Sequence, residues 1–201
     1  VIDKIGYPIV TKPINGNHGK GATTNLKNWE EACAGLEAAK KYARAVIVEK
    51  FITGYDHRIV VINYKFVAAA KRTPAAVVGD GKSTVQQLID IVNSDPRRGY
   101  GHEKVLTSIK VDDFTWNMLR EKKFNLETVL PAGEELWLKP TANISTGGTA
   151  TDVTDLVHPS NVFMCERIAR IIGLDICGID IMAPDLSTPI SENGGAILEV
   201  N

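Results

Sequence analysis

Two apolar runs, separated by the polar pair Asn63–Tyr64, constrain the fold of this chain more than any other feature. The stretch HRIVVINYKFVAAAKR covers residues 57–72 and keeps its apolar character on both sides of that pair. This pattern predicts a β-hairpin that turns at Asn63–Tyr64. Two earlier runs, PIVTKP at 8–13 and ARAVIVEKFI at 43–52, predict further strands.

Predicted helices alternate with these strands. They cover residues 28–43, 84–92, 113–123 and 160–172. In the first helix, Asn28 and Glu31 form a capping-box-like start. Four residues of this helix fall near one face: Trp29, Cys33, Leu36 and Ala43. Ser160 and Gly173 are the expected ends of the last. The strands CGIDIMAP and AILEVN are expected to close the chain as a hairpin, and NISTGGTATD is expected to be a glycine-bearing loop. The alternation of strands and helices predicts an α/β or α+β fold that divides near residue 53.

Composition excludes several classes of protein. A net charge of −1 gives no reason to expect a nucleic-acid partner. No run approaches eighteen apolar residues, so no membrane span is expected. The three cysteines are Cys33, Cys165 and Cys177; their odd number and wide spacing predict reduced, buried thiols in a cytoplasmic protein.

The stretch TKPINGNHGKGAT, residues 11–23, carries a candidate phosphate site. Gly16 and Gly21 have the spacing of a P-loop, but Ala22 and Thr23 follow where that motif needs Lys and Ser or Thr. A glycine-rich loop can still direct backbone N–H groups at an anion, and Lys12 would add a positive charge beside it. The alternative is a hairpin turn with an exposed lysine.

A second candidate site lies in the two C-terminal strands. Glu199 and Asn201 are spaced i, i+2 and therefore share one face of a strand, while Asp180 projects away from its apolar neighbours in CGIDIMAP. Two carboxylates and an amide oxygen suit Mg²⁺ that bridges phosphates. The alternative is a set of solvent-facing residues on edge strands.

The motifs together resemble the ATP-grasp superfamily and, more narrowly, the ATP-grasp module of the cyanophycin synthetases. The stretches that carry the resemblance are KPINGNHGKG, RTPAAVVGDGKSTVQQLI, NSDPRRGYGHEKVLT, TANISTGGTATDVTD and GIDIM with GGAILEVN. The resemblance implies an α+β fold in which two lobes with antiparallel sheets hold ATP between them. Residues 1–52 would belong to the first lobe and residues 53–201 to the second. We expect a fragment that lacks the preceding lobe and a following Mur-ligase-like module.

The resemblance also implies roles for individual residues. Lys12 and Lys139 would contact the phosphates of ATP, and the loop residues Gly16, Gly19, Lys20 and Gly21 would cover the phosphates. Adenine would be contacted by Glu49, Lys50, Phe51 and Ile52. Asp56 would contact the ribose. Mg²⁺ would be held by Asp180, Glu199 and Asn201. Arg58 would reach the γ-phosphate or the substrate carboxylate, and the acceptor site would be lined by Ser145, Thr146, Gly147 and Gly148.

The implied reaction is the ATP-dependent addition of aspartate to the C-terminus of a poly-aspartate, cyanophycin-like acceptor chain through an acyl phosphate, in a homo-oligomeric full-length enzyme. His18 is a candidate base for the incoming amine, the alternative being a solvated loop histidine. D-alanine ligases carry an arginine two residues before the first magnesium aspartate. This chain has Gly178 at that position, which argues against a D-alanine ligase. Two alternatives stay open: the ATP-grasp module of a fused glutathione synthetase, and a nucleotide-binding module without catalysis.

Overall fold

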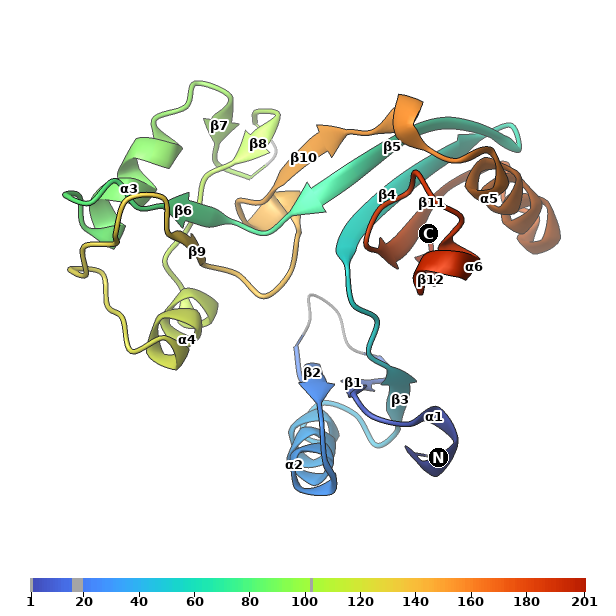
Figure 1. Cartoon of the computed structure of the whole chain (residues 1–201), viewed down its shortest axis with the longest axis horizontal. Coiled ribbons are helices and arrows are strands. Elements are labelled where there is room, and N and C mark those ends of the chain that lie inside the picture. Colours follow the sequence, from blue (N-terminus) through green and yellow to red (C-terminus); the bar gives the residue numbers. More distant parts are fainter. Residues whose placement is uncertain (1, 16–19, 102) are drawn as a thin grey trace. The chain divides into compact units, whose positions relative to one another are not determined.

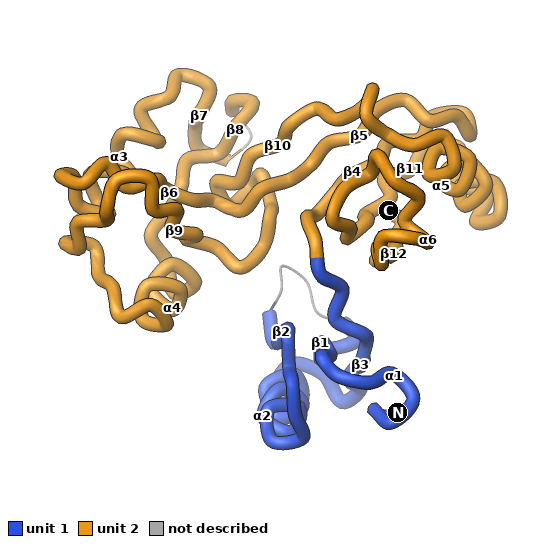
Figure 2. The backbone as a smooth tube through the Cα atoms, in the orientation of Figure 1, with its two compact units in different colours: residues 1–53 blue, residues 54–201 orange. Residues whose placement is uncertain are grey.

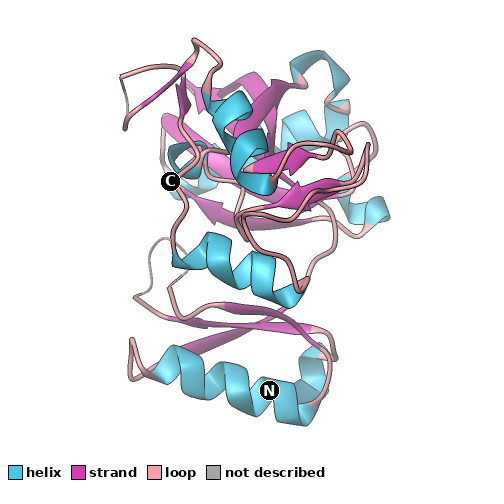
Figure 3. Cartoon of the chain, turned by 90° about the vertical axis from the view of Figure 1, so that its left-hand side faces the viewer, coloured by secondary structure: helices cyan, strands magenta, loops and turns pink. Residues whose placement is uncertain are grey.

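The computed structural model describes residues 2–15, 20–101 and 103–201, and the chain divides into two compact units, residues 1–53 and 54–201 (Figure 2). Helices and strands pack against each other in both units (Figure 3). The main sheets are antiparallel, so the predicted α+β class is confirmed. Within the described residues, no helix is long and apolar enough to cross a membrane.

Unit 1 consists of a small three-stranded sheet, in the order β2-β1-β3, and two helices (Figure 1). Its elements are α1 (Ile2–Ile5), β1 (Ile9–Pro13), β2 (Thr23–Leu26), α2 (Trp29–Lys40) and β3 (Val46–Lys50). The predicted cap of α2 is confirmed, because the Asn28 side chain accepts a hydrogen bond from the Glu31 N–H at 2.9 Å.

The face of α2 that packs on this sheet differs from the predicted one. Ala32, Gly35 and Ala39 are buried, whereas Trp29 is 66% exposed. The reason is close approach: a Cβ at Gly35 would lie only 2.6 Å from the Thr11 hydroxyl oxygen and 2.7 Å from a Leu26 methyl group. A helix that lies this near a sheet must present small residues to it.

Unit 2 is built on a five-stranded antiparallel sheet in the order β10-β5-β4-β11-β12 (Figure 1). Its strands are β4 (Tyr55–Ile62), β5 (Lys65–Thr73), β10 (Thr149–Asp152), β11 (Ile176–Ala183) and β12 (Ala196–Val200). The predicted hairpins 57–72 and 177–201 are confirmed. Asn63 and Tyr64 both have positive φ, 50° and 58°, as a two-residue type I′ turn requires. Part of the predicted loop NISTGGTATD is the edge strand β10.

A β-bulge offsets the β4–β5 hairpin by one residue. Val61 pairs with Phe66, but Val60 pairs with Ala68, so the intervening Val67 has no partner in the ladder. Beyond the bulge Asp56 therefore stands opposite Arg72. Because side chains alternate between the faces of a strand, this offset decides which β5 side chains share a face with Asp56.

Helix α5 (Pro159–Ile172) covers one face of the five-stranded sheet. Its buried Cys165 and Ala169 pack on Ile59, Ile179 and their neighbours. The predicted end at Gly173 is confirmed by its left-handed φ of 82°. The predicted cap Ser160 is wrong: the helix begins one residue earlier, at Pro159, and Ser160 N–H donates to the imidazole of the N-cap residue His158 at 3.1 Å.

All three cysteines are free thiols, as predicted, although Cys33 is only half-buried while Cys165 and Cys177 are buried. Burial raises the pKa of Cys165 to about 12, so it is unreactive at neutral pH.

Residues 74–140 of unit 2 form a second core around the two-stranded sheet β6-β9. The elements of this part and of the connections that follow it are β6 (Ala76–Val78), α3 (Val85–Asn93), β7 (Arg98–Gly99), β8 (Leu106–Thr107), α4 (Asp113–Glu121), β9 (Glu135–Trp137), the 3₁₀ turns η1 (Ile144–Thr146) and η2 (Thr154–Leu156), and α6 (Ile190–Asn193). A capping box between Thr84 and Gln87 starts α3. Leu130, Leu136 and Leu138 are fully buried in this core.

Neighbouring valines on β6 provide a matched test of this second core. Val77 is 1% exposed and Val78 is 55% exposed, because they point to opposite faces. We expect Val77→Ala to lower the free energy of unfolding by about 2 kcal/mol, from lost burial and a residual cavity. Val78→Ala should change it by less than about 0.5 kcal/mol. Urea unfolding measures both values, and equal effects would contradict the assigned strand register.

Candidate functional site

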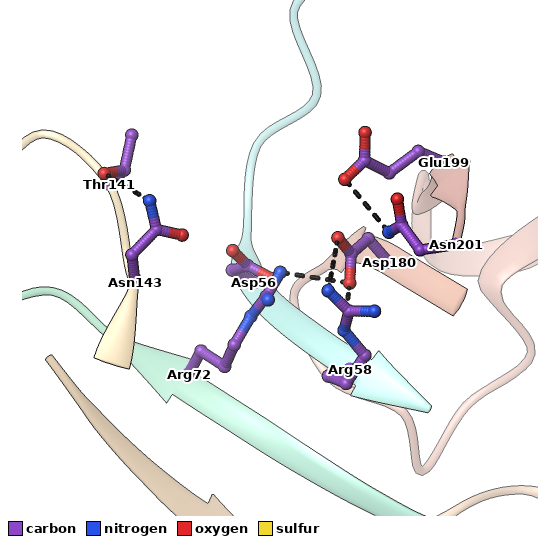
Figure 4. A network of polar contacts seen from close by, with 8 residues as sticks. All are labelled: Asp56, Arg58, Arg72, Thr141, Asn143, Asp180, Glu199 and Asn201. Atoms are coloured by element: carbon purple, nitrogen blue, oxygen red, sulfur yellow. Dashed lines mark hydrogen bonds and ion pairs between the residues drawn. The ribbon is translucent and has the colours of Figure 1, made fainter. Parts of the chain in front are cut away.

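A network of charged side chains lies on the face of the five-stranded sheet opposite α5 (Figure 4). Alternation along β4 produces this arrangement: His57, Ile59 and Val61 are buried on the α5 side, while Asp56 and Arg58 point the other way. The network comprises Asp56 and Arg58 on β4, Arg72 on β5, Asp180 on β11, Glu199 on β12, and Asn201 directly after β12.

Asp180 is the most buried member of the network, with a side chain only 7% exposed. Its Oδ1 lies 2.7 Å from Arg58 Nε and 3.1 Å from Arg72 Nη2. These contacts are ion pairs without good hydrogen-bond geometry, so Oδ1 has no hydrogen-bond partner among the described residues. Burial raises the pKa of Asp180, and the charges of Arg72 and Arg58 oppose that shift.

Arg72 connects two carboxylates of the network. Its Nη2 lies 2.6 Å and its Nε 3.0 Å from Oδ1 of Asp56, in addition to the contact with Asp180. Burial alone would lower the pKa of Arg72, but the hydrogen bond and charge of Asp56 raise it on balance. The sequence analysis missed this residue. A hairpin without a bulge would pair Asp56 with Lys71, and only the extra residue Val67 brings Arg72 to this face.

The three predicted metal ligands come together. Glu199 stands directly opposite Asp180 in the β11–β12 ladder. Asn201 donates its side-chain amide to Glu199 Oε1 at 3.1 Å, and its backbone exchanges two hydrogen bonds with Gly178. Among the described residues no group of three His, Cys, Asp or Glu side chains could hold a metal, so any site here consists of two carboxylates and one amide.

Gly178 makes room for Arg58. A Cβ at this position would lie 2.2 Å from Arg58 Nη1, so any side chain at residue 178 would displace the guanidinium group. A guanidinium group is present on this face, and it comes from β4.

Lys139, Ser145 and Thr146 line one cavity of about 130 Å³ in unit 2, together with Lys110 and Asp112. The Lys139 ammonium is buried and donates to the Lys110 carbonyl at 2.9 Å and the Thr115 hydroxyl at 3.0 Å, and it lies 2.6 Å from Asp112 Oδ1. These three contacts account for its three hydrogens. A phosphate contact by Lys139 stays a prediction and requires one of them to be replaced.

Gly147 and Gly148 are buried and tightly enclosed. Gly147 has a φ of 100°, and a Cβ there would lie 2.7 Å from the Ile109 side chain. A Cβ at Gly148 would lie 2.7 Å from the Thr73 carbonyl oxygen. The buried Arg98 donates to the carbonyls of Gly147 and Thr107 at 2.9 and 2.7 Å. These contacts give Arg98 a structural role and fix the loop that presents Ser145 and Thr146.

In unit 1, the predicted nucleotide contacts lie on two adjacent strands. Lys12 of β1 forms an ion pair with Glu49 of β3 at 2.7 Å. Lys50 donates to the carbonyls of Gly6 and Tyr7, and Phe51 N–H donates to the Pro8 carbonyl. The other predicted contacts lie outside the strands: Ile52 follows β3, and Lys20 and Gly21 lie in the turn before β2, where Gly21 has a φ of 75°. Gly16, His18 and Gly19 lie outside the described residues, so their roles remain predictions.

Comparison with known proteins shows which sequences and structures this chain is similar to. No family model matches the chain. It is 50% identical over 196 residues, 98% of its length, to cyanophycin synthetase from a Nostoc species, and 52% identical over 203 residues to that from Crocosphaera subtropica. The chain spans 22% and 23% of the length of these curated relatives.

The glutathione-synthesising proteins are more distant. The glutathione biosynthesis bifunctional protein of Streptococcus mutans is 36% identical over 190 residues, which cover 92% of this chain and 25% of that protein. A crystal structure of a bifunctional glutathione synthetase from Pasteurella multocida superimposes with a TM-score of 0.67 at 30% identity, over 96% of this chain and 26% of that one. The resemblance seen in the sequence is therefore confirmed: this chain has the ATP-grasp fold and corresponds to the ATP-grasp part of the cyanophycin synthetases.

Proposed function

We propose that this chain is the part of an ATP-dependent carboxylate–amine ligase that adds aspartate to the C-terminus of a poly-aspartate backbone. The observation that carries the proposal is the pairing of Asp180 with Glu199 beside Arg58 and Arg72, in a chain half identical to cyanophycin synthetases. The greater distance to the glutathione-synthesising proteins favours aspartate addition over that alternative.

The reaction requires two anions to meet. A carboxylate attacks the γ-phosphorus of ATP and displaces ADP. The amine of aspartate then attacks the resulting acyl phosphate, which gives an amide and releases phosphate and a proton. Positive charge placed before the reaction lowers this barrier. Arg58 and Arg72 provide it on the open face of the sheet, where Asp56 and Asp180 keep both guanidinium groups in place.

The acidic side of the network suits Mg²⁺. Asp180, Glu199 and Asn201 would hold the ion through oxygen atoms, the ligands that Mg²⁺ prefers. Asp180 Oδ1 already lies 2.7 Å from Arg58 Nε and 3.1 Å from Arg72 Nη2, so a bound Mg²⁺ would share this oxygen with the two guanidinium groups or take the place of one of them. When bound, Mg²⁺ supplies charge that neutralises the phosphates and so permits the carboxylate to approach.

We place the acceptor at the cavity lined by Lys110, Ser145 and Thr146. Lys110 is exposed and its ammonium lies 5.3 Å from the centre of the Tyr100 ring. No carboxylate among the described residues forms an ion pair with it, so it could pair with acceptor carboxylates. Lys12 and Glu49 of unit 1 would contact the nucleotide, and His18 would accept the proton of the aspartate amine.

Replacing Glu199 by Gln tests the metal assignment. The substitution keeps the shape of the side chain but removes one negative charge. We expect aspartate-dependent ADP release by the full-length protein, with a poly-aspartate acceptor, to fall by about 10²-fold or more. Glu192→Gln, an exposed change in the neighbouring helix α6, is the matched control and should leave the rate unchanged. An unchanged rate of ADP release by Glu199→Gln would contradict the assignment of Glu199 as a metal ligand.

Replacing Arg72 by Met tests the network through pH. Burial raises the pKa of Asp180 and Arg72 opposes that rise, so removal of Arg72 should raise this pKa further. The charged form of Asp180 is then lost at a higher pH, so the acid limb of the kcat/KM profile should move to higher pH. Arg170→Met, which removes an exposed arginine paired with Glu166, should leave the limb in place. An unmoved acid limb in Arg72→Met would show that Asp180 ionisation does not control the reaction.

Replacing Lys12 by Ala tests the nucleotide contact of unit 1. Loss of a charged contact to phosphate should weaken ATP binding by the full-length protein roughly tenfold to a hundredfold. The melting temperature without ATP should change little, since the ion pair with Glu49 is half-exposed. Lys27→Ala, at another exposed lysine of unit 1, is the control for calorimetric titration. Equal ATP affinities in the two variants would make Lys12 an ordinary surface residue.

A further inference from the structure

A second cavity, with a mostly apolar wall, lies on the other face of the five-stranded sheet, separate from the network of Asp56, Arg58 and Arg72. It has a volume of about 180 Å³. Its floor is formed by His57 of β4 and Lys71 of β5, which stand directly opposite each other in the ladder. Its walls come from the segment after β10 and the loop after β11, and they include Val153, Leu156, Pro184, Asp185, Leu186 and Ser187.

His57 is buried without full hydrogen bonding. The residue is 2% exposed, and its Nδ1 has no hydrogen-bond partner among the described residues. Burial lowers the pKa of His57, and the charge of Lys71 acts in the same direction. Hydrogen bonds to the Tyr55 and Ile181 carbonyls and the charge of Asp56 act in the opposite direction, but the pKa is lowered on balance, so the imidazole is neutral at pH 7. Its unpartnered Nδ1 donates a hydrogen bond when the ring hydrogen is on that atom. A buried polar group of this kind is normally matched by water or a ligand.

Lys71 provides a positive charge beside this histidine. Its ammonium lies 3.3 Å from the centre of the Tyr55 ring, and in the described parts of the chain no ion pair links it to a carboxylate. Asp185, the one carboxylate on the wall, is engaged in its own turn, where Oδ1 accepts from the N–H and hydroxyl groups of Ser187 and Thr188. The charge of Lys71 therefore remains available to an anion.

The size and lining of the cavity select the anion. Its volume equals about six waters at roughly 30 Å³ each, which exceeds a single ion and is smaller than a nucleotide pocket. Val153, Leu156, Pro184 and Leu186 make most of the wall apolar. We propose that this cavity binds a small organic carboxylate, whose charged end pairs with Lys71 and hydrogen-bonds to His57 and whose carbon skeleton packs on the apolar wall.

The test uses isovalerate as the probe, with calorimetric titration and melting temperature measured on the intact protein. We expect saturable binding with a dissociation constant in about the millimolar range. Lys71→Met, which keeps the length of the side chain without its charge, should weaken binding roughly tenfold or more. Lys82→Met, at an exposed lysine in a turn, is the matched control and should bind as the parent does.

A second variant fills the cavity without changing charge. Leu156 is 63% exposed, so Leu156→Trp should fold and yet abolish isovalerate binding. Among ligands, 3-methylbutanol has the same carbon skeleton without charge and should bind at least about tenfold more weakly. Absence of isovalerate binding, equal binding by the Lys71 and Lys82 variants, or undiminished binding by Leu156→Trp would overturn the proposal. Sulfate that binds as tightly as isovalerate would also overturn it, because the apolar wall would then contribute nothing.

Discussion

The pairing of β4 with β5 and β11 is the constraint on which the rest of unit 2 depends. All three strands are antiparallel neighbours, and β4 lies between the other two. Alternation along this central strand places His57, Ile59 and Val61 against the α5 side and Asp56 and Arg58 on the opposite side. One sheet thereby separates an apolar core from a charged face, and each position of β4 belongs to only one of them.

The charged face is stable because its charges compensate one another. A carboxylate as buried as Asp180 is costly when alone, and two guanidinium groups offset that cost. Arg72 also holds Asp56, so the acidic residues of β4 and β11 are joined through one side chain from β5. This arrangement keeps carboxylates and guanidinium groups together on one surface without ligand, which is what the proposed reaction between anions requires.

Unit 1 has a smaller core. Its three strands and helix α2 enclose a small core of Ile9, Leu26 and Ala32. Gly35 lets α2 approach this sheet closely. Lys12 lies on the central strand β1 and Glu49 on the neighbouring strand β3, and both side chains of their ion pair are half-exposed.

The sequence by itself determined the hairpins and most of the helices, because local periodicity and turn residues carry that information. The same patterns left α/β and α+β open, and the resemblance of its motifs to the ATP-grasp module implied α+β. It also put Glu199 and Asn201 on one face, since they are spaced i, i+2, whereas the register of β11 and β12, which shifts next to Asp180, decided that Asp180 stands opposite Glu199. Only the tertiary structure decided that Arg72 joins them: a single extra residue at Val67 shifts the register of β5, and no local pattern marks that bulge. The partners of Lys139, the small-residue face of α2 and the cavity between Lys71 and Leu156 were likewise decided by contacts between segments far apart in the chain, which the sequence does not record.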